Sequence, residues 1–576
     1  MKIAFLSSLD PDDIHNWSGT LYYIYHSLKR NNEVIWIGKD VLDEVKEYHY
    51  TYIKDRPFIP EYYAAFLCKL LTQKLKNEYY DIIICRDYFL CAYLVTDRPL
   101  IYIGDTNFQL FKDYLNIKDK EYENLCDKLE YEALHNANKI LYCSKWAKES
   151  AVKHYLISPQ KIRVIEFGAN LDIQGKTNRT PPTYSDCKLL FVGTNWKMKG
   201  GDKVLELHCE LRKRGVNSTL TIVGSTPSYC INLESINIYP SIDKGTEKGR
   251  KTIQELYRDS HFFILPTVFD CYGIVFCEAA AFGIPSLATN IGGISQIIHH
   301  KENGFLFSPN AKASDYADCI ITVIRENTYQ TLSKRVVSHY KKKLNWNIWL
   351  AKTSLFLEDV IKKWNKTYIP VYVINLPERR DRKAHILKEF ENKPEFNVTI
   401  TEACTHKKGT IGLWNSIVKI IKKAKENKDD VIIICEDDHY FTENYSVGLL
   451  MKEIKEAYAQ GAEILSGGIG GFGQAIPVGY HRYRIDWFWC TQFIVVYSSL
   501  FDKILSYQFK EDDTADGVLS ILASNKMVIY PFISEQKDFG YSDVTINNME
   551  HKGKIREHFA QANSVFKYIE YMKNSI

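Results

Sequence analysis

Two acidic residues, Asp270 and Glu278, are separated by seven residues and follow an expected buried strand at residues 262–265. Gly273 lies between them and marks the expected start of a helix. The free N–H groups at a helix N-terminus bind anions such as a diphosphate. One turn inside that helix, the Glu278 carboxylate can accept hydrogen bonds from two ribose hydroxyls, and Asp270 can bind sugar hydroxyls. The segment therefore predicts a site for a phosphorylated sugar compound.

A cation for this site is expected at Lys199, in a loop that follows the expected strand at residues 188–192. In an open parallel sheet, ligands bind at the carboxyl ends of the strands, so Lys199 should lie near the two acids. The pair Gly292-Gly293 allows close backbone approach to the same region. Each residue alone is typical of an ordinary surface position, whereas their combination in one α/β unit favours a functional site.

Three segments open alike, each with a short apolar strand, then a polar turn and then a helical pattern. The three expected strands are residues 2–6, 188–192 and 370–376. Strands that alternate with helices predict parallel, doubly wound sheets, and two such sheets in tandem leave a cleft between them. A helix is expected over residues 340–366, where it could return the chain to the first domain. The expected domains, each opening on one of the three strands, are residues 1–170, 171–366 and 367–576.

The N-terminal motifs resemble those of family 4 of the retaining glycosyltransferases, which have the GT-B fold. The spacing of Asp270 and Glu278 matches that family, as do Lys199-Gly200, the loop Asn16–Thr20 and the segment Phe167–Asn170. The resemblance covers residues 1 to about 365. It implies two Rossmann-like domains, an acceptor side in the first and a nucleotide-sugar donor, UDP- or GDP-linked, held by the second.

The same resemblance implies retention at the anomeric carbon, with no metal ion in this half of the chain and with catalysis mainly by positioning and phosphate stabilisation. Donor contacts are implied for Gly19, Lys199, Tyr272, Gly273, Ile274, Val275 and Glu278. Two positions depart from the family: the first acid is Asp270 instead of Glu, and Thr194 stands where a basic residue is frequent. Charge neutralisation of the diphosphate should therefore depend more on Lys199.

Asp105 follows the expected strand at residues 100–103 and could contact the sugar or the acceptor. A single acid in a turn is equally compatible with a structural role. We count Asp105 among the candidate catalytic residues together with Lys199, Asp270 and Glu278.

A second acidic group, Glu436, Asp437 and Asp438, follows the apolar strand at residues 431–435. Hard oxygen ligands suit Mg²⁺ or Mn²⁺, which would bridge a nucleotide diphosphate and stabilise it as a leaving group. Strand alternation would place Glu436 and Asp438 on one side and Asp437 on the other. The alternative is a solvated acidic turn without a metal ion.

Residues from about 368 resemble family 25-type glycosyltransferases with the GT-A fold. The matching segments are Val373–Leu376 followed by Arg379–Arg382, and later Gln536 and Ser542–Val544. Asp516 lies where an inverting enzyme of this kind could keep its general base. The glycine-rich run at residues 467–473 could form a mobile loop over a donor or a tight turn.

The net charge of +4 gives no indication of nucleic-acid binding. No signal peptide core is present and no run of about 18 apolar residues occurs, which predicts a cytoplasmic protein, with peripheral contact at the inner membrane face left open. The 14 Cys residues include no CxxC pair and are expected to be reduced thiols.

These features together predict a bifunctional glycosyltransferase that acts on a glycan or lipid-linked acceptor in bacterial-type surface polysaccharide synthesis. A first alternative keeps only the N-terminal site active and makes the C-terminal domain a non-catalytic acceptor-binding or docking module, or a degenerate transferase. A second alternative is a nucleotide-sugar epimerase, which would need no acceptor. Metal dependence separates a working second site from a docking module.

Overall fold

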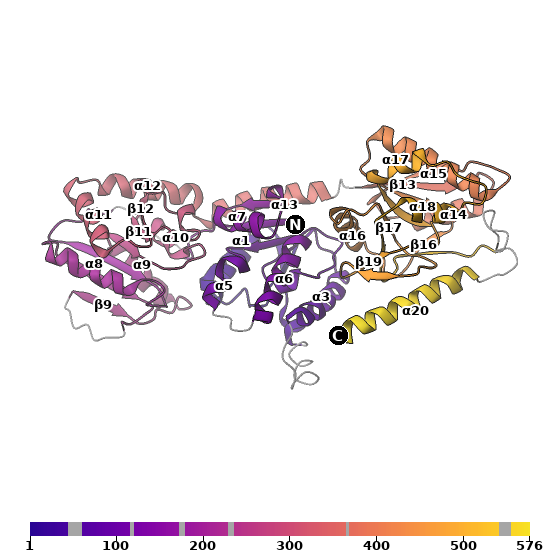
Figure 1. Ribbon diagram of the computed structural model, residues 1–576. Coiled ribbons are helices and arrows are strands. Elements are labelled where there is room, and N and C mark those ends of the chain that lie inside the picture. The colour runs from indigo at the N-terminus through magenta and orange to yellow at the C-terminus, as the bar shows by residue number, and fades with distance from the viewer. Residues whose placement is uncertain are drawn as a thin grey trace. The chain divides into compact units, whose positions relative to one another are not determined.

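The computed structural model describes residues 1–43, 60–115, 120–171, 179–227, 235–364, 368–540 and 554–575. The expected closing motif Ser542–Val544 lies outside these residues. The chain divides into two compact units, one made of Met1–Leu94 with Arg98–Ile361 and the other of Val95–Asp97 with Lys362–Ile576 (Figure 1). None of the described helices is both long and apolar enough to cross a bilayer.

The first sheet of the N-terminal unit is parallel and carries the order β2-β1-β3-β4-β5-β6. Its four inner strands, β1, β3, β4 and β5, are almost entirely apolar and buried, as expected for a parallel sheet covered on both faces. The strands are β1 (Lys2–Leu6), β2 (Glu33–Ile37), β3 (Ile82–Cys85), β4 (Leu100–Gly104), β5 (Lys139–Tyr142) and β6 (Ile162–Val164). The helices are η1 (Asn16–Gly19), α1 (Thr20–Lys29), α3 (Pro60–Lys76), α4 (Tyr88–Cys91), α5 (Phe108–Leu115), α6 (Lys120–Asn136), α7 (Lys145–His154) and η2 (Pro159–Lys161).

The second sheet is also parallel, in the order β12-β11-β10-β7-β8-β9. The order reverses between β7 and β10, which is where a doubly wound sheet binds its ligand. The strands are β7 (Cys187–Val192), β8 (Ser218–Val223), β9 (Ile236–Tyr239), β10 (Phe262–Leu265), β11 (Ser286–Thr289) and β12 (Gly304–Phe307). The helices are α8 (Gly201–Lys213), α9 (Glu247–Asp259), α10 (Ile274–Ala281), η3 (Ile294–Gln296), α11 (Ala313–Arg325), α12 (Tyr329–Lys343) and α13 (Trp346–Trp364). The prediction of doubly wound parallel sheets is confirmed for this unit.

The helix expected over residues 340–366 is interrupted. Helix α12 ends at Lys343 and α13 begins at Trp346, because the side chain of Asn345 accepts a hydrogen bond from Ile348 N (3.0 Å) and starts a new helix. The indole of Trp346 donates to the carbonyl of Ala169 (3.0 Å) and stacks on Phe167 at 5.8 Å. Helix α13, which follows the second sheet in sequence, therefore contacts residues 167–169, which follow the last strand of the first sheet.

The C-terminal unit contains a mixed sheet in the order β14-β13-β15-β20-β17-β21-β19-β18, beside the β16-β22 pair. Strands β13, β14 and β15 are parallel, whereas β20 pairs antiparallel to β15. The strands are β13 (Ile369–Asn375), β14 (Phe396–Glu402), β15 (Val431–Glu436), β16 (His439–Phe441), β17 (Ile464–Ser466), β18 (Ala475–Pro477), β19 (Arg482–Ile485), β20 (Phe493–Tyr497), β21 (Lys526–Ile529) and β22 (Ser534–Gln536). This unit is an additional α/β sheet region of the chain.

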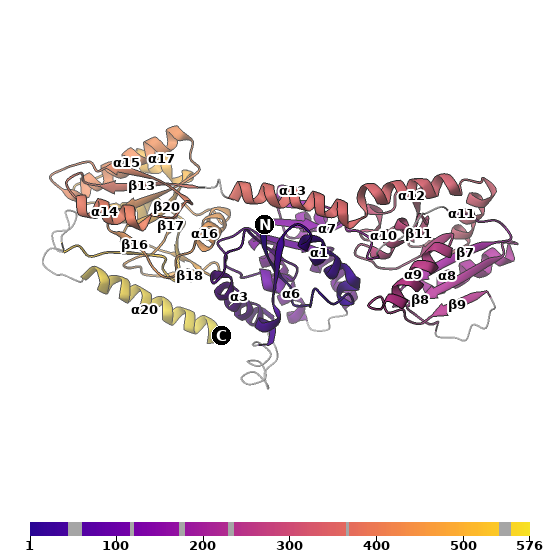
Figure 2. The same ribbon diagram turned by 180° about the vertical axis from the view of Figure 1, so that it is seen from behind.

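The helices of the C-terminal unit are α14 (Arg380–Glu389), α15 (Gly409–Asn427), α16 (Val447–Ala459), α17 (Ser498–Ser506), α18 (Ala515–Leu522) and α20 (Lys554–Ser575). Phe566 of α20 is fully buried and contacts the ring of Tyr483 in β19 at 5.0 Å. Figures 1 and 2 show α20 alongside this unit. Phe559, Ala562 and Phe566 of α20 therefore belong to the core of the C-terminal sheet.

Candidate functional site

The N-terminus of α10 lies where the sequence predicts an anion-binding helix start. Gly273 precedes Ile274 and has φ of +87°, a left-handed conformation that favours glycine. A Cβ at Gly273 would lie 2.5 Å from the ring of Phe276, so a larger residue would displace that ring. The helix follows β10 at the carboxyl end of the sheet, beside the point where the strand order reverses.

Glu278 is fully buried and is held by two side chains that the sequence analysis does not identify. Its Oε1 accepts a hydrogen bond from Lys244 Nζ at 2.7 Å, and its Oε2 accepts one from the Tyr257 hydroxyl at 2.9 Å. Lys244 lies in the loop between β9 and α9, and Tyr257 lies in α9. A buried carboxylate needs such partners because an unpaired buried charge is costly.

Lys199 and Asp270 form an ion pair with Nζ and Oδ2 2.6 Å apart. Their side chains are 22% and 14% exposed, so the pair remains accessible to a ligand. Lys199 reaches this position through a tight turn in which Gly200 has φ of +76° and a Cβ on Gly200 would lie 2.1 Å from the carbonyl oxygen of Pro266. The structure thus brings together Lys199 and Asp270, which are 71 residues apart in sequence.

The remaining expected donor contacts lie around the same helix start. Ile274 and Val275 are half-buried in the first turn of α10. The side chain of Tyr272 is buried, and its hydroxyl donates to the carbonyl of Phe167 at 3.2 Å. Only the backbone of Tyr272 is therefore left to contact a nucleotide-sugar donor. Gly292 packs against the preceding segment, because a Cβ there would lie 1.9 Å from the carbonyl oxygen of Asp270.

The expected glycine loop of the first domain has a strained backbone. Trp17, Ser18 and Gly19 have φ of +51°, +55° and +87° in succession. The side chain of Asn170 holds this loop by donating to the Ser18 carbonyl at 2.9 Å and to the Thr20 hydroxyl at 3.0 Å. Strain of this kind is concentrated at functional sites. The hydrogen bonds of Asn170 connect the two N-terminal motifs, at residues 16–20 and 167–170.

Asp105 follows β4 and accepts a hydrogen bond from the indole of Trp17 at 3.2 Å. The Arg86 guanidinium lies over the Trp17 ring at 4.8 Å. Burial raises the pKa of Asp105 to about 6, the Arg86 charge opposes that rise, and the negative charge of Asp270 adds to it. Asp105 is therefore within electrostatic reach of the Lys199–Asp270 pair.

The three acids of the C-terminal unit occupy different environments. Glu436 is the last residue of β15, and Asp437 and Asp438 form a turn, so the expected strand alternation does not extend past Glu436. Both oxygens of Asp437 are engaged, one with Arg382 at 3.2 Å and the other with Asn375 at 2.8 Å. Each oxygen of Asp437 therefore already accepts one hydrogen bond in the structure, and the metal-ligand role of Asp437 stays a prediction.

Asp438 keeps one oxygen available. Its Oδ2 accepts hydrogen bonds from Arg382 at 3.2 Å and from Gln536 at 2.9 Å, whereas its buried Oδ1 has no hydrogen-bond partner among the described residues. Glu436 accepts from the Thr491 hydroxyl at 2.5 Å. Burial and the charge of Asp438 raise the pKa of Glu436, and burial raises that of Asp438. The two carboxylates therefore crowd negative charge at the end of β15.

Asp516 opens α18 and lies close enough to Glu436 to contribute to its raised pKa. Its Oδ2 accepts from Cys490 N at 3.3 Å, and its Oδ1 accepts from Gly517 N at 2.9 Å. The structure brings Asp516 near the acids of β15. The glycine-rich run is buried from Gly467 to Gly470, and a Cβ at Gly468 would lie 2.0 Å from the Ser534 carbonyl oxygen, so this part of the run packs against β22.

The described residues contain no group of three or more His, Cys, Asp or Glu side chains that could hold a metal ion. A protein-only cage is thus absent from the described part of the C-terminal unit. Mg²⁺, however, commonly takes one or two carboxylates and completes its shell with water and substrate phosphates. The unpartnered Oδ1 of Asp438, beside Glu436, fits a cation bound in that second way.

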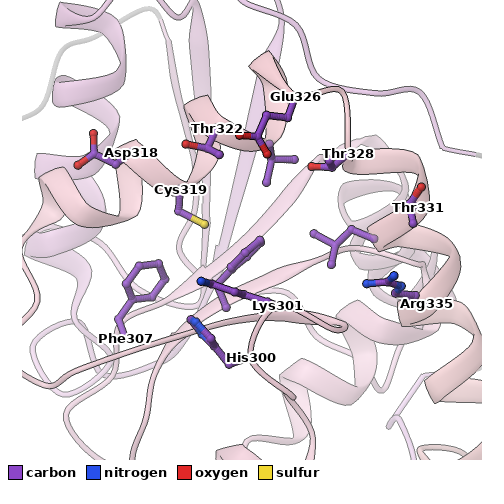
Figure 3. Close-up of a pocket in the computed structure, with 13 residues that line it drawn as sticks. His300, Lys301, Phe307, Asp318, Cys319, Thr322, Glu326, Thr328, Thr331 and Arg335 are labelled. Carbon is purple, nitrogen blue, oxygen red and sulfur yellow. The ribbon is translucent and has the colours of Figure 1, made fainter.

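A separate pocket of about 610 Å³ lies between β12, α11 and α12. Figure 3 shows Lys301 and His300 facing Cys319 and Thr322 across it. The lining combines the basic residues Lys301 and Arg335 with apolar side chains, and it includes none of the predicted site residues. The pocket is therefore distinct from the constellation around α10.

Two family models match the N-terminal unit. The model described as Glycosyltransferase Family 4 matches residues 20–173, and the model described as Glycosyl transferases group 1 matches residues 179–342. The site residues Lys199, Asp270 and Glu278 lie within the second match, whereas residues beyond 342 lie outside both.

Curated relatives match the same region at low identity. A D-inositol 3-phosphate glycosyltransferase from Rhodococcus jostii is 23% identical over 296 residues, covering 47% of this chain and 65% of the relative's length. An uncharacterized glycosyltransferase from Methanocaldococcus jannaschii is 24% identical over 306 residues, covering 48% of this chain and 76% of the relative. A solved glycosyltransferase structure from Rickettsia africae has a TM-score of 0.44 and 18% identity, covering 63% of this chain and 98% of that chain.

Proposed function

We propose that this protein, a glycosyltransferase whose residues 20–342 hold domains of the GT-B type, transfers a sugar from a nucleoside diphosphate donor to a hydroxyl-bearing glycan or lipid-linked glycan acceptor. The observation that carries the proposal is the arrangement of Lys199, Asp270 and Glu278 around the N-terminus of α10. One positive helix end, one lysine and two carboxylates provide partners for a diphosphate and for sugar hydroxyls.

Each group has a distinct task in this mechanism. The N–H groups at the start of α10 and the ammonium of Lys199 stabilise the negative charge that develops on the leaving diphosphate. Glu278 accepts hydrogen bonds from the ribose hydroxyls, and Asp270 accepts hydrogen bonds from the donor sugar. The spacing of these two acids supports retention of configuration at the anomeric carbon, because it matches the retaining family.

The acceptor side of the mechanism involves Asp105 and Trp17. The indole N–H of Trp17 orients the carboxylate of Asp105 at 3.2 Å, and a carboxylate accepts hydrogen bonds from sugar hydroxyls. We assign Asp105 to the acceptor hydroxyl, which attacks the anomeric carbon. The relative from Rhodococcus jostii is described as acting on an inositol phosphate, which supports a polyhydroxylated acceptor for this chain.

A panel of nucleotide sugars tests the proposal directly. Calorimetry with the full chain and UDP-, GDP- and ADP-linked hexoses should identify one base that binds, and the corresponding donor should release its nucleoside diphosphate when an acceptor is present. Binding of none of these donors, or conversion of a donor sugar without any acceptor, would contradict the transferase proposal and favour an epimerase.

A second transfer in the C-terminal unit is favoured by one observation, the buried and unpartnered Oδ1 of Asp438 beside Glu436. These two carboxylates would hold Mg²⁺ or Mn²⁺, which would supply positive charge for a second diphosphate leaving group. Asp516 would be the general base of this second site, as in the family 25-type resemblance. The competing function is an acceptor-binding or docking module, which requires no cation.

A further inference from the structure

Lys244 lies in the loop before α9, Tyr257 lies in α9, and both side chains contact Glu278. Neither the loop nor α9 contributes any of the predicted site residues. Lys244 Nζ lies 2.7 Å from Oε1 of Glu278, and the Tyr257 hydroxyl lies 2.9 Å from Oε2. Glu278 is 0% exposed, whereas the Lys244 side chain is 26% exposed. The lysine therefore contacts the buried carboxylate on one side and remains accessible on the other.

A count of lone pairs shows what this arrangement leaves available. An ionised carboxylate has about four acceptor positions, two on each oxygen. Lys244 uses one on Oε1 and Tyr257 uses one on Oε2, so one acceptor position on each oxygen has no hydrogen bond among the described residues. Because the Glu278 side chain is 0% exposed, a ribose reaches these positions only when the side chains around the carboxylate move. Two positions on adjacent oxygens match the two neighbouring hydroxyls of a ribose. Both partners are donors, so they also prevent the carboxylate from rotating.

The loop that carries Lys244 is held in place before any ligand binds. Arg250 donates to the carbonyls of Lys244 and Gly245 at 3.0 and 2.9 Å. The carboxylate of Asp243 accepts from Gly245 N at 2.7 Å, and the Thr246 side chain caps α9. Because these contacts fix the loop backbone, little ordering entropy remains to be lost when the ammonium group pairs with Glu278.

We propose that Lys244 is a positioning residue for donor recognition: it holds the Glu278 carboxylate in one orientation, so that the enzyme distinguishes ribose from 2′-deoxyribose in its nucleotide. The inference rests on the proposed function, since it assigns a role to a residue beside the same donor site. Tyr257 acts with Lys244 by holding the second oxygen. Lys244 itself acts through Glu278 rather than on the reacting atoms.

The test compares three substitutions at Lys244 with a matched control in the full-length protein. Lys244→Met removes the charge, Lys244→Gln keeps a polar group without charge, and Lys244→Arg keeps the cation. Lys251→Met is the control, because Lys251 lies on α9 in an exposed pair with Glu247 at 2.6 Å. Calorimetry measures the affinity for UDP, GDP and ADP and for the 2′-deoxy form of each.

For the nucleotide that binds, we expect the unmodified enzyme to prefer the ribose form by about tenfold, the value of one charge-assisted hydrogen bond. Lys244→Met and Lys244→Gln should reduce that preference to less than about threefold, whereas Lys244→Arg and Lys251→Met should retain it. Thermal unfolding of each variant shows whether a loss of ribose preference is due to misfolding. If Lys244→Met does not fold, Lys244→Gln still tests the removal of the charge.

Two results would overturn the inference, and they have different meanings. If Lys244→Met and Lys244→Gln keep the full ribose preference while Glu278→Gln loses it, Lys244 has no positioning role although the proposed function stands. If no nucleoside diphosphate binds the unmodified protein, the proposed function fails and the role of Lys244 fails with it.

Discussion

Replacing Lys199 by Met is expected to lower turnover far more than it weakens nucleoside binding. In the structure the Lys199 ammonium lies 2.6 Å from Asp270. The proposed mechanism places the leaving diphosphate beside this pair, at the start of α10. At a separation of about 4 Å and an effective dielectric constant of about 20, a unit charge pair is worth about 4 kcal/mol. Because Asp270 offsets part of the lysine charge, we expect a loss of about 2.7 kcal/mol, or roughly a hundredfold in kcat.

The assay is steady-state release of nucleoside diphosphate by the full chain, with calorimetry of the unphosphorylated nucleoside in parallel. Lys197→Met is the matched control, since Lys197 lies in the same loop and is exposed. Its kcat should be unchanged within about twofold. Nucleoside affinity should also remain within about twofold in the Lys199 variant, because a nucleoside has no phosphate for Lys199 to bind.

A double-mutant cycle with Asp270→Asn separates a phosphate role from a purely structural ion pair. If the Lys199–Asp270 pair mattered only for shaping the site, the double variant would recover most of the lost turnover, since neither residue would be left unpaired. We expect no recovery, because both side chains contact the donor in our mechanism. Turnover of Lys199→Met close to that of the unmodified enzyme would refute the reasoning.

The remaining predictions concern other groups of the two units. The kcat/KM should rise with pH through about 6 as Asp105 loses its proton, since only the anion is a strong acceptor for the attacking hydroxyl. Asp105→Asn should give a low, flat pH profile, and an unchanged profile in this variant would exclude Asp105 from the acceptor role. EDTA and Asp438→Ala should abolish the same sugar addition and spare the one due to Lys199 and Glu278, as measured by product mass; two metal-independent additions would contradict the second site. Arg482→Ala should destabilise the C-terminal unit by about 3–5 kcal/mol in urea unfolding, because it leaves Glu453, 1% exposed, as an uncompensated buried charge, and a change below about 1 kcal/mol would contradict this.

The sequence was sufficient to predict the elements that position the first site. A buried strand, a proline and then Gly273 indicate a strand followed by a helix start, and β10 and α10 have those bounds. Local patterns suffice here because hydrophobic runs and glycine act over a few residues. The grouping of Lys199 with Asp270 could also be expected, since both follow strands of one parallel sheet.

The partners of the buried acids could not be predicted in this way. Lys244 and Arg382 lie 34 and 56 residues from Glu278 and Asp438, respectively, and their pairing depends on how separate elements pack. An isolated lysine or arginine in a loop or helix carries no local signal for such a contact. The alternation argument for Asp437 fails for a related reason, because β15 ends at Glu436 and the following residues form a turn.

The most direct test of the central claim is calorimetry of the nucleotide sugar with the full chain in the presence of EDTA. The account predicts metal-independent binding that Glu278→Ala weakens about ten- to hundredfold, the value of one or two charge-assisted hydrogen bonds. Glu255→Ala is the control, since Glu255 is an exposed acid of α9 in the same domain and should bind the donor normally. Equal donor affinity in the Glu278 and Glu255 variants, or binding that EDTA removes, would contradict a donor site built from α10, Lys199 and Glu278.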